Sequence, residues 1–356
     1  MPAAKGQVHT PDTQLASPAD STTVEVPRSI EHIAPIADLI ASRPSGALTR
    51  LQELELMHHY VTRTAETTTH GEEDIDIWRI AIPHEAAQHE FLMDGLLAVT
   101  ALHVAHLRPS KSEMYAAAAM YYQNRGLRHY QPALLDITDD NCRAMFAFGM
   151  ILSTITLAVA NGAPDGPNNS ARNTVITMFH LVRGNTMVVV DQSQQALLSS
   201  AFGPIFTLFD RRVDSAVPED VTHNLDLLRQ RVHASAADTE PGRRRMFISA
   251  VDCLEQDFRK VDRGKSLSAV MGWPVVIDHA MIDLLAQQDP IVQLIFATYG
   301  VLLLCVHDVW YGKDFGLRLI RQMSESLHSL GPEWVPWTAW AREKAALIES
   351  SAIKPG

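Results

Sequence analysis

The sequence predicts an all-α protein, a single large multi-helix domain preceded by a disordered N-terminal tail. Apolar residues recur at intervals of three and four through most of the 356 residues, the spacing that places them on one face of a helix. No alternating pattern is long enough for a sheet, and the β-favouring run from Val188 to Val190 is short and follows a helical pattern. No repeat of fixed period occurs, which excludes a solenoid.

Composition divides the chain into a tail, a linker and a body. Residues 1–28 are rich in Pro, Ser, Thr and Asp, and they carry too few apolar side chains to offset the entropy cost of ordering. Isoleucines near helical spacing predict a short helix and linker over residues 29–47. Residues 48–350 are predicted to form the helical body, and a segment dense in Gly, Pro and Asn at residues 162–170 is predicted to be a loop between two helical halves.

Capping residues and prolines place the individual helices. Thr49 is suited to the N-cap position, Pro83 to the first turn of a helix, and Pro109 to a helix end. In the first half these signals predict helices over residues 51–61, 83–107, 115–130 and 144–160. In the second half they predict helices over residues 174–190, 197–209, 219–236, 243–261, 277–286, 290–310, 315–330 and 334–350.

Charge and cysteine content exclude several classes of protein. Thirty Lys and Arg against 41 Asp and Glu give a net charge of −11, which opposes non-specific binding to nucleic acid. Three scattered cysteines favour a reducing intracellular compartment, and the first residues lack the apolar run of a secretory signal. The apolar stretches Ala144–Pro164 and Ile291–His307 contain Ser, Thr, Gln and Gly, so we expect buried helices and no membrane span.

Motifs for common chemistries are missing from the sequence. There is no nucleophile elbow, phosphate-binding loop, dinucleotide turn or Cys-x-x-Cys pair, so no cofactor is expected. His84 and His89 are five residues apart, whereas a zinc-protease helix needs histidines four apart to share one face. His103 and His106 share a helix face that His58 or His59 can approach, but helix-packing histidines are the simpler interpretation, and no metal site is predicted.

Several short motifs follow one another along the body: Leu54-Glu-Leu-Met-His-His-Tyr60, Trp78, Ile82-Pro-His-Glu-Ala-Ala87, the run from Phe91 to His103, Leu181-Val-Arg-Gly184, Gly272-Trp-Pro274, Asp289-Pro290 and the run from Ala297 to Leu303. In this order, over about residues 48–345, they resemble the C-terminal regulatory domain of fungal binuclear zinc-cluster transcription factors of the sterol uptake control type. The resemblance implies a helical, often dimeric domain with an apolar cavity that senses a sterol or another lipid.

The sequence also departs from that family. A binuclear cluster needs six closely spaced cysteines, and residues 1–47 contain none, so no direct DNA binding by such a module is expected. Near the C-terminus, Ala341-Arg342 follow Trp340 where the family usually has Trp-Pro.

The predicted helix over residues 290–310 carries the candidate ligand site. It is apolar nearly all round, so it should be central, and a glycine in its middle allows either close helix packing or the approach of an apolar ligand. Aromatic residues with one polar atom can orient a single hydroxyl in such a pocket. The candidate ligand-binding residues are Phe296, Tyr299, Gly300, Leu303 and Trp310.

Two functions of different classes follow, and a third interpretation concerns the gene. The first is a transcription regulator, in the nucleus or cytoplasm, that senses an apolar, sterol- or terpenoid-like small molecule. It acts as a homodimer or as a heterodimer with a zinc-cluster factor, and lipid or secondary-metabolite genes are its expected targets. The second is a cyclase or isomerase of secondary metabolism, with His58, His59, His103 and Asp94 as proton-transfer groups. The third is a gene model that lacks an upstream exon encoding the cluster.

Overall fold

The computed structural model describes residues 47–69, 74–162, 166, 170–210, 216–235, 241–261 and 267–352. The predicted all-α class is confirmed, since every element formed by these residues is a helix or a helical turn. The predicted tail over residues 1–28 lies outside the described residues. The same holds for all but the last residue of the predicted linker over 29–47 and for most of the predicted loop at 162–170.

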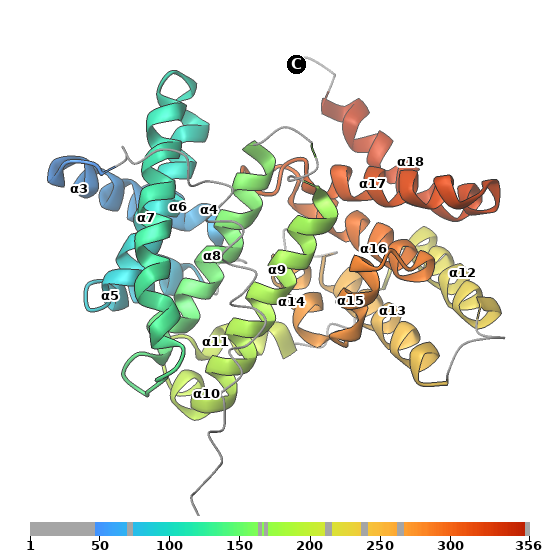
Figure 1. Cartoon of the computed structure of the whole chain (residues 1–356), viewed down its shortest axis with the longest axis horizontal. Coiled ribbons are helices and arrows are strands. Elements are labelled where there is room, and N and C mark those ends of the chain that lie inside the picture. Colours follow the sequence, from blue (N-terminus) through green and yellow to red (C-terminus); the bar gives the residue numbers. More distant parts are fainter. Residues whose placement is uncertain are drawn as a thin grey trace, which may run out of the picture.

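The N-terminal half is built from α3 to α8 (Figure 1). Thr49 caps α3 as predicted, because its hydroxyl accepts from the Gln52 amide while the Gln52 side chain accepts from the Thr49 amide. The elements are α3 (Arg50–His59), η1 (Tyr60–Thr64), α4 (Ala65–Thr68), η2 (Ile77–Ala81), α5 (Ile82–Ala86), α6 (Glu90–Leu107), η3 (Pro109–Lys111), α7 (Ser112–Ala133) and α8 (Cys142–Gly162).

The C-terminal half contains more and shorter helices than predicted. Its elements are α9 (Ala171–Asn185), η4 (Thr186–Val190), α10 (Asp191–Leu198), α11 (Gly203–Asp210), α12 (Glu219–Ser235), α13 (Pro241–Val261), α14 (Leu267–Val276), α15 (Ala280–Ala286), α16 (Pro290–Leu303), η5 (Leu304–Val306), α17 (Phe315–Leu330), η6 (Pro332–Trp334) and α18 (Val335–Ala352). The run from Val188 to Val190 lies in the π-helical turn η4 and forms no strand.

Three predicted helices end or break earlier than the apolar pattern indicated. The helix from Pro83 to Leu107 is two helices, because a turn at Ala87–Gln88 and the extended backbone of His89 separate α5 from α6. The helix over 197–209 is divided between α10 and α11. The helix over 290–310 ends at Leu303 and continues as a single 3₁₀ turn, so Trp310 lies in the connection to α17. The spacing of apolar residues shows which side chains are buried. A buried turn can have the same spacing as a helix, so the pattern does not show where the helix ends.

Two hydrophobic cores hold the molecule together, and the helices that form them lie on opposite sides of Figure 1. The first is formed by α3 to α8, and the second by α12 to α18 with the first part of α9. The cores do not divide at the predicted loop, because Leu197, Phe202 and Ile205 from α10 and α11 pack into the first core. The chain therefore enters the second core at the start of α9 and returns to the first core with α10 and α11. It then forms the rest of the second core with α12 to α18.

Two helices of the first half are long and apolar enough to cross a membrane, α6 and α8. Within the fold, 67% of the apolar window of α6 and 78% of that of α8 are buried. A third candidate joins α15 to the helix beginning at Pro290 across a bend of 102°. The burial of α6 and α8 agrees with their use as core helices, and the lack of a membrane span stays a prediction.

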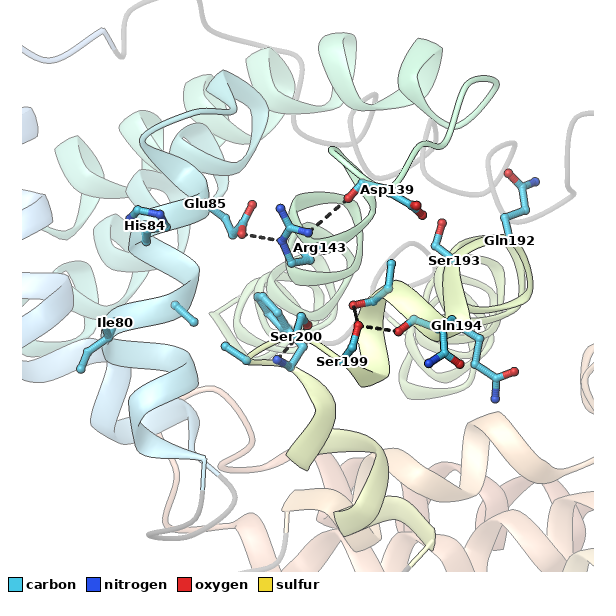
Figure 2. Close-up of a pocket in the computed structure, with 15 residues that line it drawn as sticks. Ile80, His84, Glu85, Asp139, Arg143, Gln192, Ser193, Gln194, Ser199 and Ser200 are labelled. Carbon is cyan, nitrogen blue, oxygen red and sulfur yellow. Dashed lines mark hydrogen bonds and ion pairs between the residues drawn. The ribbon is translucent and has the colours of Figure 1, made fainter.

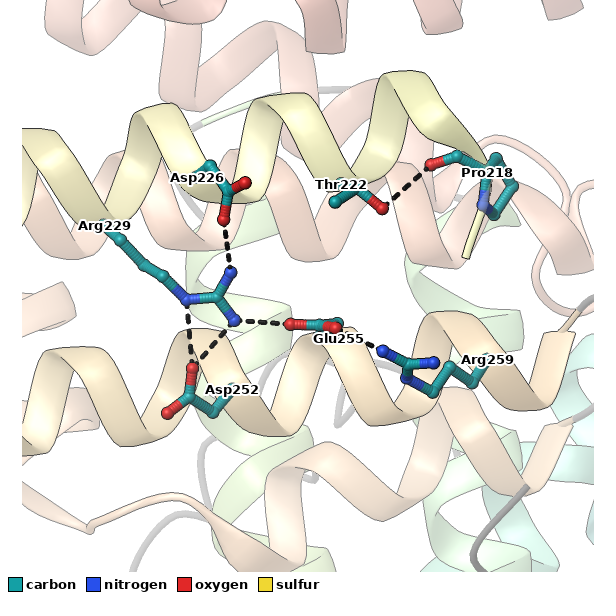
Figure 3. A network of polar contacts seen from close by, with 7 residues as sticks. All are labelled: Pro218, Thr222, Asp226, Arg229, Asp252, Glu255 and Arg259. Carbon is teal, nitrogen blue, oxygen red and sulfur yellow. Dashed lines mark hydrogen bonds and ion pairs between the residues drawn. The ribbon is translucent and has the colours of Figure 1, made fainter. Parts of the chain in front are cut away.

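A network of charged side chains joins α12 to α13 across the surface of the second half (Figure 3). The Arg229 guanidinium donates to Asp226 at 2.9 Å, to Asp252 at 2.8 Å and to Glu255 at 2.6 Å, and Glu255 also accepts from Arg259 at 2.5 Å. These groups are partly exposed, so each pair contributes little alone. Their main effect is to fix the register of the two helices.

The crossing of α16 and α17 depends on two glycines. A methyl group on Gly316 would lie 2.9 Å from the Gly300 carbonyl oxygen and 3.1 Å from the Leu303 carbonyl carbon. A methyl group on Gly300 would lie 2.7 Å from Cγ1 of Ile320. The two helix backbones are therefore in direct contact at this point.

Replacement of Gly316 by Ala is predicted to lower the free energy of unfolding by about 1–3 kcal/mol, because backbone atoms must move apart to admit the methyl group. The matched control is Gly242→Ala, since Gly242 is also the second residue of its helix and its added methyl would have no neighbour within 4 Å. That variant should be neutral or stabilised by about 0.4–1 kcal/mol. Urea denaturation measures both, and equal effects of the two substitutions would show that the crossing is not tight.

Candidate functional site

A groove of about 570 Å³ opens where the two halves meet. Three of its walls belong to the first half: the end of α6, the start of α7 and the end of α8. The fourth is the connection between α16 and α17, which contributes Trp310, Lys313 and Asp314. Half of the residues that line it are apolar, namely Leu102, Ala105, Ala116, Met120, Ala158, Val159 and Trp310.

Trp310 links the two halves at this groove. Its side chain packs against both hydrophobic cores. The indole stacks on the His103 ring with the centroids 5.0 Å apart, and its Nε1 donates to the Thr67 hydroxyl at 2.9 Å. The contact between Trp310 and Thr67 joins residues 243 positions apart in the chain. Trp310 was predicted as a ligand-binding residue, and it is the member of that set that lines the groove.

A π-helical turn, η1, positions the residues that Trp310 meets. Such a turn adds one residue to a helix and rotates everything after it by about 100°. Thr64 at the end of η1 lies 2.9 Å from Nδ1 of His103 in a hydrogen bond, and Thr67 in the following α4 accepts from Trp310. The π-helical turn therefore places the hydroxyls of Thr64 and Thr67 at the junction, the site where His103 and Trp310 meet between the two halves.

The histidines of the junction are held in the neutral form. Burial, reinforced by the charges of His59 and His106, lowers the pKa of His103 to about 4. Burial and the positive charges of Arg108 and Arg63 also lower the pKa of His59, whose ring meets that of His103 edge-on with the centroids 5.3 Å apart. A charged imidazole would be repelled by its neighbours here, so the His103 ring that stacks on Trp310 is neutral at neutral pH.

Stability is therefore predicted to fall as the pH drops from about 6.5 toward 4. In that window the unfolded chain binds a proton at His103 that the folded chain excludes, at a cost on the order of 3 kcal/mol. The substitution His103→Gln should flatten this dependence, whereas His58→Gln at an exposed position should leave it unchanged. Urea denaturation between pH 7 and 4.5 measures it, and an unaltered slope in His103→Gln would contradict the assignment.

A second pocket, of about 760 Å³, lies between α5, the start of α8 and α10 (Figure 2). Glu85 is buried there and accepts from Arg143 Nε at 2.7 Å, while Arg143 Nη1 donates to the Asp139 carbonyl at 3.2 Å. The hydroxyls of Ser199 and Ser200 donate to main-chain carbonyls of α10. These polar groups form hydrogen bonds with one another or with main-chain carbonyls. We therefore interpret the pocket as part of the packing of α10 against the first half.

The other four predicted ligand-binding residues lie in the second core. Phe296 and Tyr299 are fully buried among Phe179 and Trp273, and the Tyr299 hydroxyl donates to the Val270 carbonyl at 2.8 Å. Gly300 and Leu303 form the close crossing with α17 described above. Trp310 therefore lines the groove, whereas the other four residues pack inside the second core. Ligand binding by these four residues stays a prediction.

The four candidate proton-transfer residues are not brought together. His58 is exposed, whereas His59 and His103 meet at the junction. Asp94 is buried and paired with Arg125 of α7, and its nine-residue separation from His103 along α6 corresponds to roughly 13 Å. Burial raises the pKa of Asp94, and the Arg125 guanidinium opposes that rise. An acid and a base facing one substrate are therefore not formed by these residues.

Among the described residues, no group of three or more His, Cys, Asp or Glu side chains is placed to hold a metal ion. His84 is exposed, and His89 lies 4.0 Å from Glu85 as its helical neighbour.

Sequence reasoning missed two polar residues of the groove region, Thr67 and Asn161. Thr67 lies beyond the predicted helix over residues 51–61, and Asn161 directly follows the predicted helix over residues 144–160. Neither carries a local signal, because each acquires its role from a contact with the distant segment around Trp310 and Tyr311.

Comparison with known proteins adds a family match over part of the chain. A family model described as "Fungal specific transcription factor domain" matches residues 55–181, which include the groove walls from α6, α7 and α8. The chain is 27% identical over 274 residues to "Sterol uptake control protein 2" of Saccharomyces cerevisiae, covering 75% of this chain and 29% of that protein. It is 24% identical over 317 residues to a "Zn(2)-C6 fungal-type transcription factor" of Gibberella zeae, covering 85% and 63%.

A further relative is "Sterol uptake control protein 2" of Candida albicans, 31% identical over 142 residues, which cover 38% of this chain and 19% of that protein. The matched part spans less than two thirds of the length of each of these relatives.

Proposed function

We propose that this chain regulates transcription in response to an apolar ligand bound in the groove beside Trp310, because residues 55–181 match the family model of the fungal specific transcription factor domain. The observation that carries this proposal is the position of the groove. It joins three helices of the family-matched half to a segment of the second half, so its occupant contacts both.

The shape and lining of the groove support an apolar ligand. Its volume lies within the roughly 300–1,000 Å³ of small-molecule sites, and apolar side chains with a few polar groups at the edge are typical of such sites. The indole of Trp310 offers a flat apolar face at the groove. Two relatives carry the name sterol uptake control protein, so a sterol is the first ligand to test.

DNA contact requires a second component. The 356 residues contain three cysteines, whereas a binuclear zinc cluster needs six. A net charge of −11 gives no electrostatic attraction to DNA. We propose that the regulator acts in the nucleus through a DNA-binding partner, as a homodimer or as a heterodimer with a zinc-cluster factor. A cluster encoded upstream in the same gene is the other source, and the genomic sequence decides between them.

Filling the groove is predicted to weaken binding of a sterol. In Ala116→Phe the ring would occupy the groove, so the affinity for dehydroergosterol should fall at least tenfold, about 1.4 kcal/mol. The control is Met114→Phe, at an exposed position whose side chain points about 160° away from that of Ala116 around α7, and it should change affinity less than twofold. Energy transfer from tryptophan to the fluorescent sterol measures binding. Equal affinities of Ala116→Phe and wild type would place the ligand elsewhere.

Deletion of the gene is predicted to change a set of transcripts together. The wild-type gene should restore them, and the Ala116→Phe variant should restore basal levels without the response to sterol. Transcript and metabolite profiles of the same cultures test this. Unchanged transcripts with accumulation of one hydrophobic intermediate would reject the regulator and favour an enzyme or carrier. In that case His59 and His103, which do meet at the junction, are the first residues to replace.

A further inference from the structure

The outer face of α3 is apolar and uncovered. Leu51 is 79% exposed, and Leu54, nearly one turn further along the helix, is 57% exposed. Among the described residues, α3 is the one helix that exposes two large apolar side chains within a single turn. Single exposed leucines are ordinary on a protein surface, whereas two side by side on one helix face favour an element that covers them.

The opposite side of α3 is held against the body. The Leu48 amide, just before the helix, donates to the Tyr122 hydroxyl of α7 at 3.3 Å, and that hydroxyl donates to Glu53 at 2.7 Å. In Figure 1, α3 lies at the outer edge of the first half. These contacts fix the rotation of α3 about its axis, so the two leucines are turned away from the first core.

The chain that directly precedes α3 contains a segment suited to this face. Residues 1–46 lie outside the described structure, and within them residues 1–28 carry few bulky apolar side chains. Beyond these, apolar residues recur at i, i+3, i+4 and i+7, the spacing of one helix face, at Ile33, Ile36, Ala37 and Ile40. A helix that begins at Pro35 and ends before Pro44 is shorter than the roughly 12–15 residues needed for stability alone in water. It therefore needs a surface to pack against.

The connection has the length of a helical hairpin. Six residues, 43–48, separate the end of this segment from the Thr49 cap of α3, and they include Pro44 and Gly46. Connections of about two to eight residues are usual between packed helices. A short tether also holds the segment near α3 at an effective concentration on the order of millimolar, so a weak contact is populated.

The size of the face favours this tethered segment over a second copy of the chain. The ten residues of α3 give a face about 15 Å long and about 10 Å wide. A stable interface between two chains buries roughly 800 Å² on each partner. The face of α3 is several times smaller, which suits one short helix of the same chain.

We propose that residues 33–42 fold back on α3 as an antiparallel helix, with Ile36 and Ile40 covering Leu51 and Leu54. This contact is separate from the groove and does not depend on the proposed function. Because α3 continues directly into η1, whose Thr64 is hydrogen-bonded to His103, the docked segment is joined to the junction through continuous helical backbone. The contact positions the N-terminal part of the chain relative to the junction.

Hydrogen exchange on the full-length protein tests the contact. In wild type, the amides of residues 36–42 should exchange at least about tenfold more slowly than those of residues 1–28, because docking holds them in a helix. The double substitution Leu51→Gln and Leu54→Gln should reduce this difference to less than about twofold, and so should Ile36→Gln with Ile40→Gln. The control is Leu347→Gln, at a leucine of α18 that is 56% exposed, and it should leave the protection unchanged.

Three results would overturn the proposal. Equally fast exchange of residues 36–42 and 1–28 in wild type would show that the segment does not dock. Protection that survives the double substitution on α3 would place the segment on another surface. Protection that is lost on about a hundredfold dilution would assign the face to a second copy, because a contact within one chain does not depend on concentration. The dilution series uses wild type alone, so it remains decisive if a substituted protein does not fold.

Discussion

The junction at Trp310 is the contact on which the arrangement of the two halves depends. Three anchors hold the segment that follows α16 against the first half. Trp310 donates to Thr67, Asn161 donates to the Tyr311 carbonyl, and Arg318 donates to the Ala160 carbonyl at 2.5 Å. Each anchor joins residues 150 or more positions apart. The halves thus meet through these directional hydrogen bonds and the indole between the two cores, together with packing in which Leu157 of α8 joins the second core and α9 contributes to both cores.

The glycine crossing of α16 and α17 determines where that segment lies. Because the backbones touch at Gly300 and Gly316, α17 returns directly over α16, and the connection between them must leave the bundle sideways. The turn at its apex is equally tight, since a side chain on Gly312 would meet the Val306 carbonyl oxygen at 2.8 Å. The close contact of α16 with α17 on one side and the tight turn at Gly312 on the other restrict the orientation in which Trp310 contacts the first half.

The sequence predicted the helices well and the junction poorly, for a physical reason. Apolar periodicity records which residues are buried, so it located most of the helices of both cores. It does not record where buried backbone stops being helical, and it therefore extended the helix of Pro290 through Trp310, which the structure places in a loop. That error grouped Trp310 with Phe296 and Tyr299, although the loop carries it to the boundary between the two cores. The approach of His59 to His103 was foreseen, because both lie on helices whose packing faces the pattern defined.

The contacts of the junction explain how a ligand could influence the rest of the molecule. A ligand shifts a conformational equilibrium only by the difference in its affinity for the two states. A groove confined to one half would bind equally well whether or not the halves were docked. This groove takes three walls from the first half and its fourth from the Trp310 segment, so undocking removes a wall and part of the binding energy. Since a hydrogen bond contributes only about 1 kcal/mol net, the three anchors and one stacked ring are of the same order as the binding energy of a small apolar molecule. On the proposed function, a ligand in the groove therefore shifts the docking of the Trp310 segment, because the two energies are comparable.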